Sequence, residues 1–159
     1  MSRYTLTEVV PAIPDGLRRR FLLADRRQTG RVAVLVVAFD GDYPDGSLGN
    51  GHGAFIATSA LQGLHAFEPD CVVLDFRGMS YRWGNTLLRV FQDISQFMDS
   101  GIEPGGVPFP VVAVTSERSR AAFLSLVTPG GGPAPSWHFD DIDAAIAHGA
   151  SKAKEWLES

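Results

Sequence analysis

The stretch that decides the fold is Val32-Ala-Val-Leu-Val-Val-Ala-Phe39. It is apolar at nearly every position, so we expect a strand whose two faces are both covered by other parts of the chain. A shorter apolar run at 20–24 precedes it, and the residues between the two runs, Asp25-Arg-Arg-Gln-Thr-Gly30, have turn chemistry with Gly30 able to take a positive φ. The two runs predict an antiparallel hairpin.

Further along the chain, short apolar runs alternate with segments of helical spacing. The runs predict strands at 71–76, 110–115 and, as a short edge strand, 137–139. Helices are predicted at 54–67, from 84 or 85 to 100, at 117–127 and, after an Asp140 or Asp141 cap, at 142–157. We therefore predict a single-domain α/β fold with a mostly parallel sheet of about five strands, opened by the antiparallel hairpin, and about four helices. Residues 1–16 are expected to form an irregular leader, and residues 17–159 the domain.

The composition is that of an ordinary globular chain, with 159 residues, 45% of them hydrophobic and 20% charged. The net charge of −4 argues against nucleic-acid binding, which usually needs a basic face. The single cysteine, Cys71, excludes an internal disulfide. The sequence shows neither a secretory signal pattern nor an apolar run of membrane-spanning length. We expect a cytoplasmic protein that does not bind a membrane.

Two segments carry a resemblance to a known family. Val72-Val-Leu-Asp-Phe-Arg-Gly-Met-Ser-Tyr81 resembles the strand-three signature of STAS domains, the fold of anti-sigma-factor antagonists, and Phe139-Asp-Asp-Ile-Asp-Ala-Ala-Ile146 resembles that family's final segment. In STAS antagonists the signature continues into Asp-Ser-Ser-Gly, whose first serine accepts phosphate from a partner kinase. The corresponding positions here hold Trp83, Gly84, Asn85 and Thr86. The resemblance therefore implies a regulatory binding module without the usual phosphoacceptor serine.

The order of predicted elements from Arg20 to Val127 also resembles the crotonase and Clp-protease superfamily, in which the corresponding strand can end in a similar Asp-Leu-Arg-Gly phrase. This second resemblance implies an acyl-thioester-binding enzyme, or a degenerate relative of one. Loop amides near 41–53 and 78–84 would then form an anion hole. The chain departs from the superfamily after 111–115, where Ser-Glu-Arg-Ser-Arg stands in place of a glycine run.

Segment 75–85 is the first candidate site, because it leaves the carboxyl end of a predicted central strand, where open α/β sheets bind ligands. It is rich in arginine and aromatic side chains, which are enriched in binding hot spots, and an arginine can hold a carboxylate or phosphate through two hydrogen bonds. The alternative is structural, with Asp75 paired to Arg77 and the rings covering the core. The candidate binding residues are Asp75, Arg77, Tyr81, Arg82, Trp83 and Asn85.

Segment 40–53 is the second candidate. It holds five glycines and a proline, so we predict a long loop ahead of a helix. The free amides and the dipole of a helix N-terminus favour an anion, although the P-loop Lys-Ser/Thr pair is absent. A plain surface loop is the alternative. The candidate anion-binding residues are Gly49, Asn50, Gly51, His52 and Gly53.

The remaining patterns favour neither a metal site nor catalysis. The aspartates of segment 40–53 offer oxygen ligands, but their spacing differs from that of an EF-hand, and the histidines lack metal-ligand spacing. Ser116, His52 and Asp75 supply the residue types of a catalytic triad, as do many chains with several serines. We predict no cofactor and no bound metal.

The sequence thus favours a non-catalytic regulatory or protein-interaction module over an enzyme. The expected partner is another protein, whose identity the sequence does not specify. A homo-oligomer, in which the partner is a second copy of the chain, is also compatible with this prediction. Two alternatives stay open: the crotonase-like acyl-thioester-binding enzyme or a degenerate relative, and an accessory or immunity-type subunit of a larger assembly.

Overall fold

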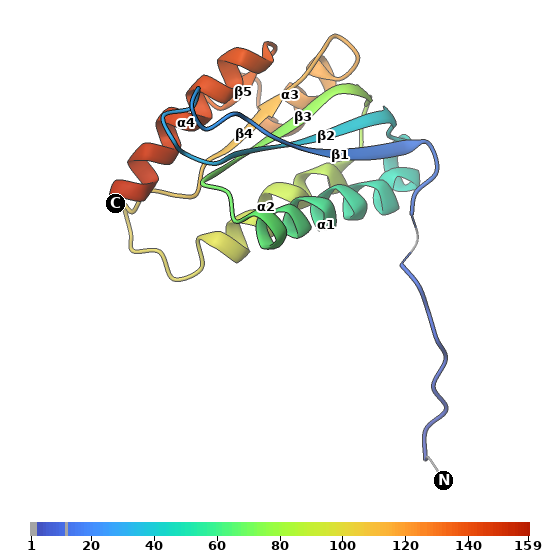
Figure 1. The fold of residues 1–159 in the computed structure, drawn as a ribbon. Helices are drawn as coiled ribbons and strands as arrows, with labels where there is room; N and C mark the ends of the chain where they lie inside the picture. The colour runs from blue at the N-terminus through green and yellow to red at the C-terminus, as the bar shows by residue number, and fades with distance from the viewer. Residues whose placement is uncertain (1–2, 12) are drawn as a thin grey trace.

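The structure is a computed structural model that describes residues 3–11 and 13–159 (Figure 1). Strands and helices alternate along the chain after an opening pair of strands. Two of the helices are preceded by a short 3-10 turn, labelled η. In chain order the elements are β1 (Leu17–Leu23), β2 (Val34–Asp42), η1 (Gly46–Gly49), α1 (Asn50–Phe67), β3 (Cys71–Ser80), η2 (Asn85–Leu88), α2 (Arg89–Met98), β4 (Val111–Val114), α3 (Arg120–Val127), β5 (His138–Phe139) and α4 (Ile142–Glu158).

The strands form one five-stranded sheet in the order β1-β2-β3-β4-β5. β1 runs antiparallel to β2, with Phe21 opposite Val37, and every other pair of neighbours is parallel. Each parallel strand is added beside the one before it in the chain, so the order in the sheet follows the order in the sequence. The predicted α/β class, the antiparallel opening pair and the four helices are confirmed within the described residues.

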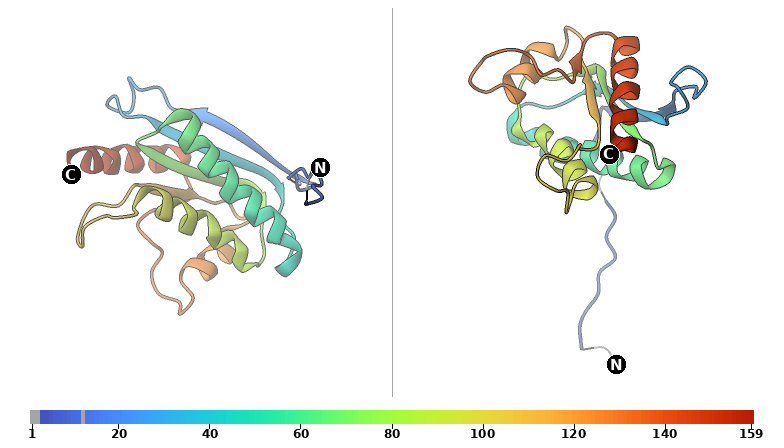
Figure 2. Two further views of the ribbon diagram at one scale, coloured as in Figure 1. Left: turned by 90° about the horizontal axis from the view of Figure 1, so that it is seen from below. Right: turned by 90° about the vertical axis from the view of Figure 1, so that its left-hand side faces the viewer.

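Helices cover both faces of the sheet, which explains the continuous apolar sequence of β2. α1 and α2 lie side by side on one face, and α4 crosses the other face (Figures 1 and 2). Leu35 and Val37 belong to the larger core with α1 and α2, whereas Val34 and Val36 belong to the smaller core under α4. α4 approaches the sheet closely because Gly149 lies over the buried thiol of Cys71.

The two central strands extend further than the sequence predicted. We expected loops from Asp40 and from Arg77, but β2 continues to Asp42 and β3 to Ser80. Their pairing resumes after a register shift, with Asp40 opposite Gly78. Glycine fits here because a side chain at position 78 would collide with the Asp40 carboxylate. Asp and Gly are depleted in strands, so the local sequence favoured a loop. The pairing between β2 and β3 nevertheless makes these residues part of a strand.

The helices differ from their predicted ranges mainly at the start. α1 begins at Asn50 instead of residue 54, because η1 leads directly into it and the Asn50 N–H bonds to the Ser47 carbonyl. η2 leads into α2 in the same way, and α3 begins at Arg120 instead of residue 117. The predicted cap of α4 is confirmed as Asp141, whose carboxylate accepts the Ala144 N–H at 2.9 Å.

The segment before β1 extends away from the rest of the molecule (Figure 1). We call residues 3–16 the N-terminal arm; its described residues are exposed except Pro14, which is half-buried. The arm joins the sheet at its base, where the Asp42 N–H donates to the Gly16 carbonyl at 2.9 Å. The body of the molecule therefore starts at Leu17, which is buried.

Candidate functional site

The two candidate segments, 40–53 and 75–85, meet at one edge of the sheet. They follow the neighbouring parallel strands β2 and β3, whose carboxyl ends lie together. Hydrogen bonds join the segments at successive points: the Tyr43 N–H to the Ser80 carbonyl (2.9 Å), the Gly46 N–H to the Trp83 carbonyl (3.2 Å) and the Thr86 hydroxyl to the Asn50 side-chain oxygen (2.5 Å). The exposed side chains here, together with the half-buried Asp45, form one surface, which we call the carboxyl-edge surface: Asp45, Leu48, Arg82, Trp83 and Asn85.

Asp75 and Arg77 bind each other within β3. The Asp75 carboxylate is buried, with 6% of the residue exposed, and it accepts hydrogen bonds from the Arg77 guanidinium at 2.9 Å through each of Nε and Nη2. The Asp75 side chain also accepts the Arg77 backbone N–H at 3.1 Å. The hydrogen bond to Asp75 raises the pKa of Arg77. The two-pronged face of this guanidinium is therefore engaged inside the protein.

Tyr81 lies beneath the carboxyl-edge surface, with 2% of the residue exposed. Its hydroxyl donates to the Gly84 carbonyl at 2.8 Å, and its ring packs edge-on against Tyr43, with the centroids 5.1 Å apart. Burial raises the pKa of both tyrosines to about 12. Tyr81 thus fixes the backbone that carries Trp83.

Trp83 projects from this support, and 62% of the residue is exposed. Its ring lies over Gly46, where any side chain would collide with it. Beside it, Arg82 forms an ion pair with Asp45 through Nη2 and a 3.2 Å hydrogen bond through Nε. Leu48, on the same turn as Gly46, is 78% exposed. The surface therefore combines two exposed apolar side chains with a charged pair.

The predicted anion-binding residues form the first turn of a helix and not a loop. Gly49 caps α1, and Asn50 to Gly53 are its first four residues. His52 Nε2–H donates to the Asp15 carbonyl at 3.0 Å, and Nδ1 is buried with no partner among the described residues. A Cβ at Gly53 would lie 2.6 Å from Thr86 Cγ2, so α1 and η2 touch closely there.

The side chains of the sequence-level triad do not hydrogen-bond to one another. The Ser116 hydroxyl donates to the Arg77 carbonyl at 2.7 Å, Asp75 binds the Arg77 guanidinium and His52 bonds to Asp15. Among residues 3–11 and 13–159, no group of three or more His, Cys, Asp or Glu side chains is placed to hold a metal ion. The side chains that offered catalytic roles are thus bonded within the protein, and Trp83 stays exposed on a hydrogen-bonded support.

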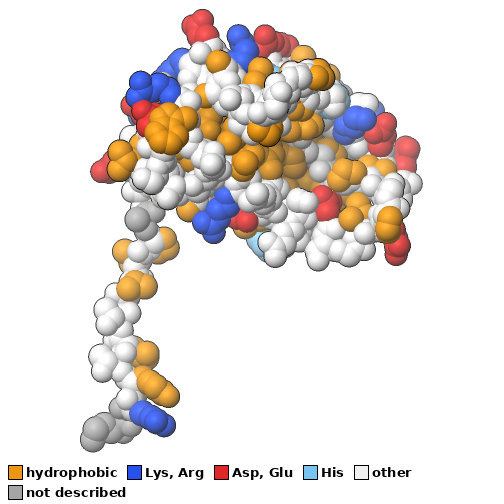
Figure 3. Space-filling model, turned by 180° about the vertical axis from the view of Figure 1, so that it is seen from behind, with side chains coloured by type: hydrophobic (Ala, Val, Ile, Leu, Met, Phe, Trp, Pro, Cys, Tyr) orange, Lys and Arg blue, Asp and Glu red, His pale blue; other side chains and the backbone are white. Residues whose placement is uncertain are grey.

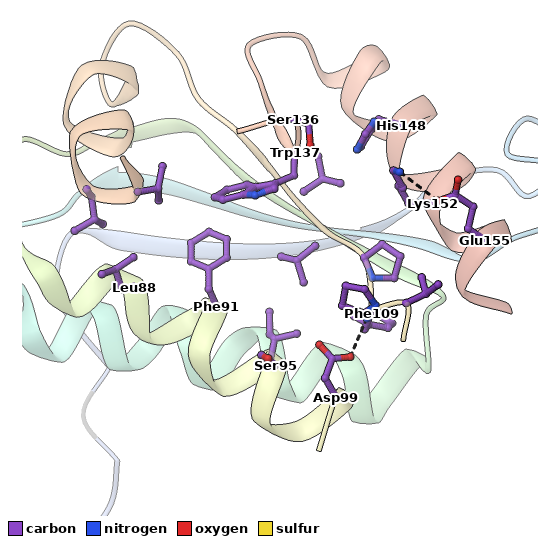
Figure 4. Close-up of a pocket in the computed structure, with 18 of the residues that line it drawn as sticks. Leu88, Phe91, Ser95, Asp99, Phe109, Ser136, Trp137, His148, Lys152 and Glu155 are labelled. Carbon is purple, nitrogen blue, oxygen red and sulfur yellow. Dashed lines mark hydrogen bonds and ion pairs between the residues drawn. The ribbon is translucent and has the colours of Figure 1, made fainter. Parts of the chain in front are cut away.

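Sequence reasoning missed a groove of about 700 Å³ along β4. Nineteen residues line this β4 groove. They come from η2–α2 with its C-cap Asp99, the 107–110 connector, β4, the end of α3, the 129–137 loop and α4. Figure 3 shows a hollow with apolar walls on this face, and Figure 4 shows Phe91 and Trp137 next to each other in its lining, with their ring centroids 5.3 Å apart. Polar side chains lie on two of its walls, with Ser95 and Asp99 on the α2 side and, on α4, Lys152 paired with Glu155 at 3.2 Å. The apolar connector before β4 was the only local signal.

No protein-family model, curated protein or solved structure matches this chain. The resemblances to STAS domains and to crotonases therefore rest on the motifs and the element order quoted above, and both stay predictions. In the described part of the chain, no helix has the length and apolar character needed to cross a membrane.

Proposed function

We propose that this chain is a non-catalytic protein-interaction module that recognises a partner protein through the carboxyl-edge surface. The observation that carries the proposal is Trp83, a large ring that is 62% exposed on a fixed support. Tryptophan and arginine are the residue types most enriched in binding hot spots, and both stand here side by side. An apolar pocket on the partner would take the Trp83 ring, with Leu48 beside it.

The support of Trp83 lowers the entropic cost of binding. Its carbonyl accepts the Gly46 N–H, and the next carbonyl, that of Gly84, accepts the buried Tyr81 hydroxyl. The ring rests on Gly46, which stands at a φ of 59° and leaves room for it. Side chains that are ordered before binding lose less conformational freedom on contact, so more of the interaction energy appears as affinity.

The bonding pattern supports recognition over chemistry. The Gly46 amide, which an anion hole would need, already donates to Trp83, and the Asn50 amide donates to Ser47. The side chains that offered a nucleophile and a base are bonded to other groups. The module that we propose is a STAS-like regulator without the family's acceptor serine, and the positions of the missing phosphorylation motif carry the exposed Trp83 instead. We place its action in the cytoplasm, because its one cysteine is buried and unpaired.

The test starts with native mass spectrometry of the tagged protein isolated gently from its host, which identifies a co-purifying protein. That protein is then purified, and its affinity is measured by calorimetry for the wild type, Trp83→Ala and Arg82→Ala. We expect each substitution to raise Kd more than about fivefold, which corresponds to about 1 kcal/mol. Leu157→Ala is the matched control, because it removes an exposed apolar side chain from the far end of α4.

Equal affinity of the wild type and the Trp83→Ala and Arg82→Ala variants would refute the proposal. Urea unfolding of each variant separates a lost contact from a lost fold, and we expect these exposed substitutions to leave the unfolding midpoint in place. A co-purifying mass that matches a CoA thioester, in place of a protein, would favour the acyl-thioester-binding alternative and would also overturn the proposal.

A further inference from the structure

The N-terminal arm exposes apolar side chains that its own chain does not cover. Leu6, Val9, Val10 and Ile13 are each at least 78% exposed. Isolated exposed aliphatic residues are ordinary, but these four lie close together in the chain, at positions 6, 9, 10 and 13, and clustered exposed apolar side chains usually mark an interaction site. The segment is rich in β-branched residues, which favour an extended conformation against a sheet.

The β4 groove offers a surface of matching character. β3 pairs with β4 along its whole length, but β5 pairs only with Ala113 and Val114, so on the side away from β3 no strand of the described residues lies beside the first half of β4. The groove runs along this uncovered edge, and its walls include Phe91, Trp137 and Phe109. An extended segment laid in it would meet apolar side chains on both sides and an open strand edge at its floor.

The other edge of the sheet is less suited to receive the arm. β1 forms that edge and carries Arg18, Arg19 and Arg20 in succession. Charged side chains on an edge strand discourage the addition of a further strand. The arm holds two acidic residues, Glu8 and Asp15, and the basic Arg3, so its net charge of −1 does not complement three arginines.

We propose that the arm docks in the β4 groove of a second copy of this chain, and that two copies exchange arms. Within one chain the arm starts at β1 and the groove lies beside β4, on opposite edges of the sheet. Fourteen arm residues span at most about 46–50 Å. Crossing three strand spacings and passing round the layer of α1 and α2 takes about 35 Å of this length, so only about three or four of the fourteen residues could lie in the groove.

The size of the exchanged contact fits a stable dimer. In each copy the ten described residues at 3–11 and 13, together with the fifteen groove residues that are not already buried, would become interface. Standard protein interfaces use about 20–30 residues from each partner. The exchange is isologous, because each copy gives one arm and receives one, so the contact closes at two copies and does not propagate.

The first test is sedimentation of the full chain over a series of concentrations. We expect a reversible dimer for the wild type, and a dimer Kd raised about a hundredfold by Val10→Asp, since both arms lose a buried side chain. Ser95→Trp fills the groove from an exposed position on α2 and should have a similar effect. Leu23→Asp is the control, because it makes the same kind of change outside the arm and the groove.

The second test identifies which groove receives the arm. Val10→Cys and Ser95→Cys are placed in two differently tagged copies and oxidised after mixing, while the buried Cys71 stays unreactive. A disulfide between the two tags is expected, and none is expected when Leu23→Cys replaces Val10→Cys. A monomer at all concentrations, a dimer unaffected by both Val10→Asp and Ser95→Trp, or a disulfide formed only within one chain carrying both cysteines would overturn the proposal.

Discussion

A methyl group added to α1 tests the contact between α1 and η2, which lies next to the carboxyl-edge surface. Gly51 and Gly53 both lie in the first turn of α1. A Cβ at Gly53 would lie 2.6 Å from Thr86 Cγ2 and 2.8 Å from the Thr86 carbonyl oxygen. At Gly51, outside its own turn of helix, no atom of the described residues lies within 4 Å of the added Cβ. The same substitution by alanine therefore meets open space at one position and η2 at the other.

The magnitudes follow from two opposing effects. Alanine is better than glycine in a helix by about 0.8–1.0 kcal/mol, so Gly51→Ala should raise the free energy of unfolding by up to that amount. Gly53→Ala has the same benefit, but overpacking costs about 1–3 kcal/mol, and the upper part of that range applies because the backbone carbonyl of Thr86 cannot rotate away. We expect Gly53→Ala to be about 1–2 kcal/mol less stable than the wild type.

The assay is urea unfolding followed by circular dichroism, with the two variants compared at equal denaturant slope. Gly53→Ala combined with Thr86→Ser should recover part of the loss, because it removes the Cγ2 contact and leaves the carbonyl contact. If Gly53→Ala were as stable as Gly51→Ala, α1 and η2 would not be in contact at this point, and the close approach of the two segments beside the carboxyl-edge surface would be wrong.

Three further predictions use buried groups. Tyr81→Phe should lower the free energy of unfolding, measured by urea titration, by about 1 kcal/mol, since the Gly84 carbonyl loses its partner. Tyr43→Phe should leave that free energy unchanged, because the Tyr43 hydroxyl has no partner among the described residues. Burial raises the pKa of both tyrosines to about 12, above the usual value of about 10 in an unfolded chain, so the native state holds these protons more tightly. The free energy of unfolding should therefore fall between about pH 10 and 12, and it should fall less steeply in Tyr43→Phe. An unchanged slope in that variant would count against this cause. Burial likewise raises the pKa of the Cys71 thiol to about 12, so at pH 8 a maleimide should label it only as fast as the chain unfolds globally, and fast labelling of the native protein would show that α4 does not cover it.

The fold was predictable because its strands carry patterns that arise from burial. Residues 32–39 are apolar throughout since helices cover both faces of β2, and this requirement shows in the sequence itself. The strand ends were not predictable, because Gly78 and Asp40 belong to a strand only through their pairing with each other. The start of α1 was missed for a related reason: its glycines allow the close approach of Thr86, a residue distant in the sequence.

The candidate site was predictable as a region and not as a set of roles. Segment 75–85 contributes to a surface at the sheet edge, as the position after a central strand indicates. The sequence did not separate the exposed Trp83 from the buried Tyr81, because both are aromatic residues of one short segment. It did not reveal the β4 groove either, because that groove is built from six segments that come together only in the folded chain.

The base of the arm lies next to the carboxyl-edge surface, so the proposed partner contact and the proposed arm exchange start close together in space. The two contacts can still be tested separately. Asp15 and Gly16 are bonded to His52 and Asp42 at the carboxyl edge, so the residues before them can move to another copy while this edge stays as it is. Trp83→Ala should then leave the dimer Kd unchanged in sedimentation, and Val10→Asp should leave partner affinity unchanged in calorimetry. If each substitution weakened both contacts, the arm and the carboxyl-edge surface would belong to a single interface, and the separate roles that we assign to them would be wrong.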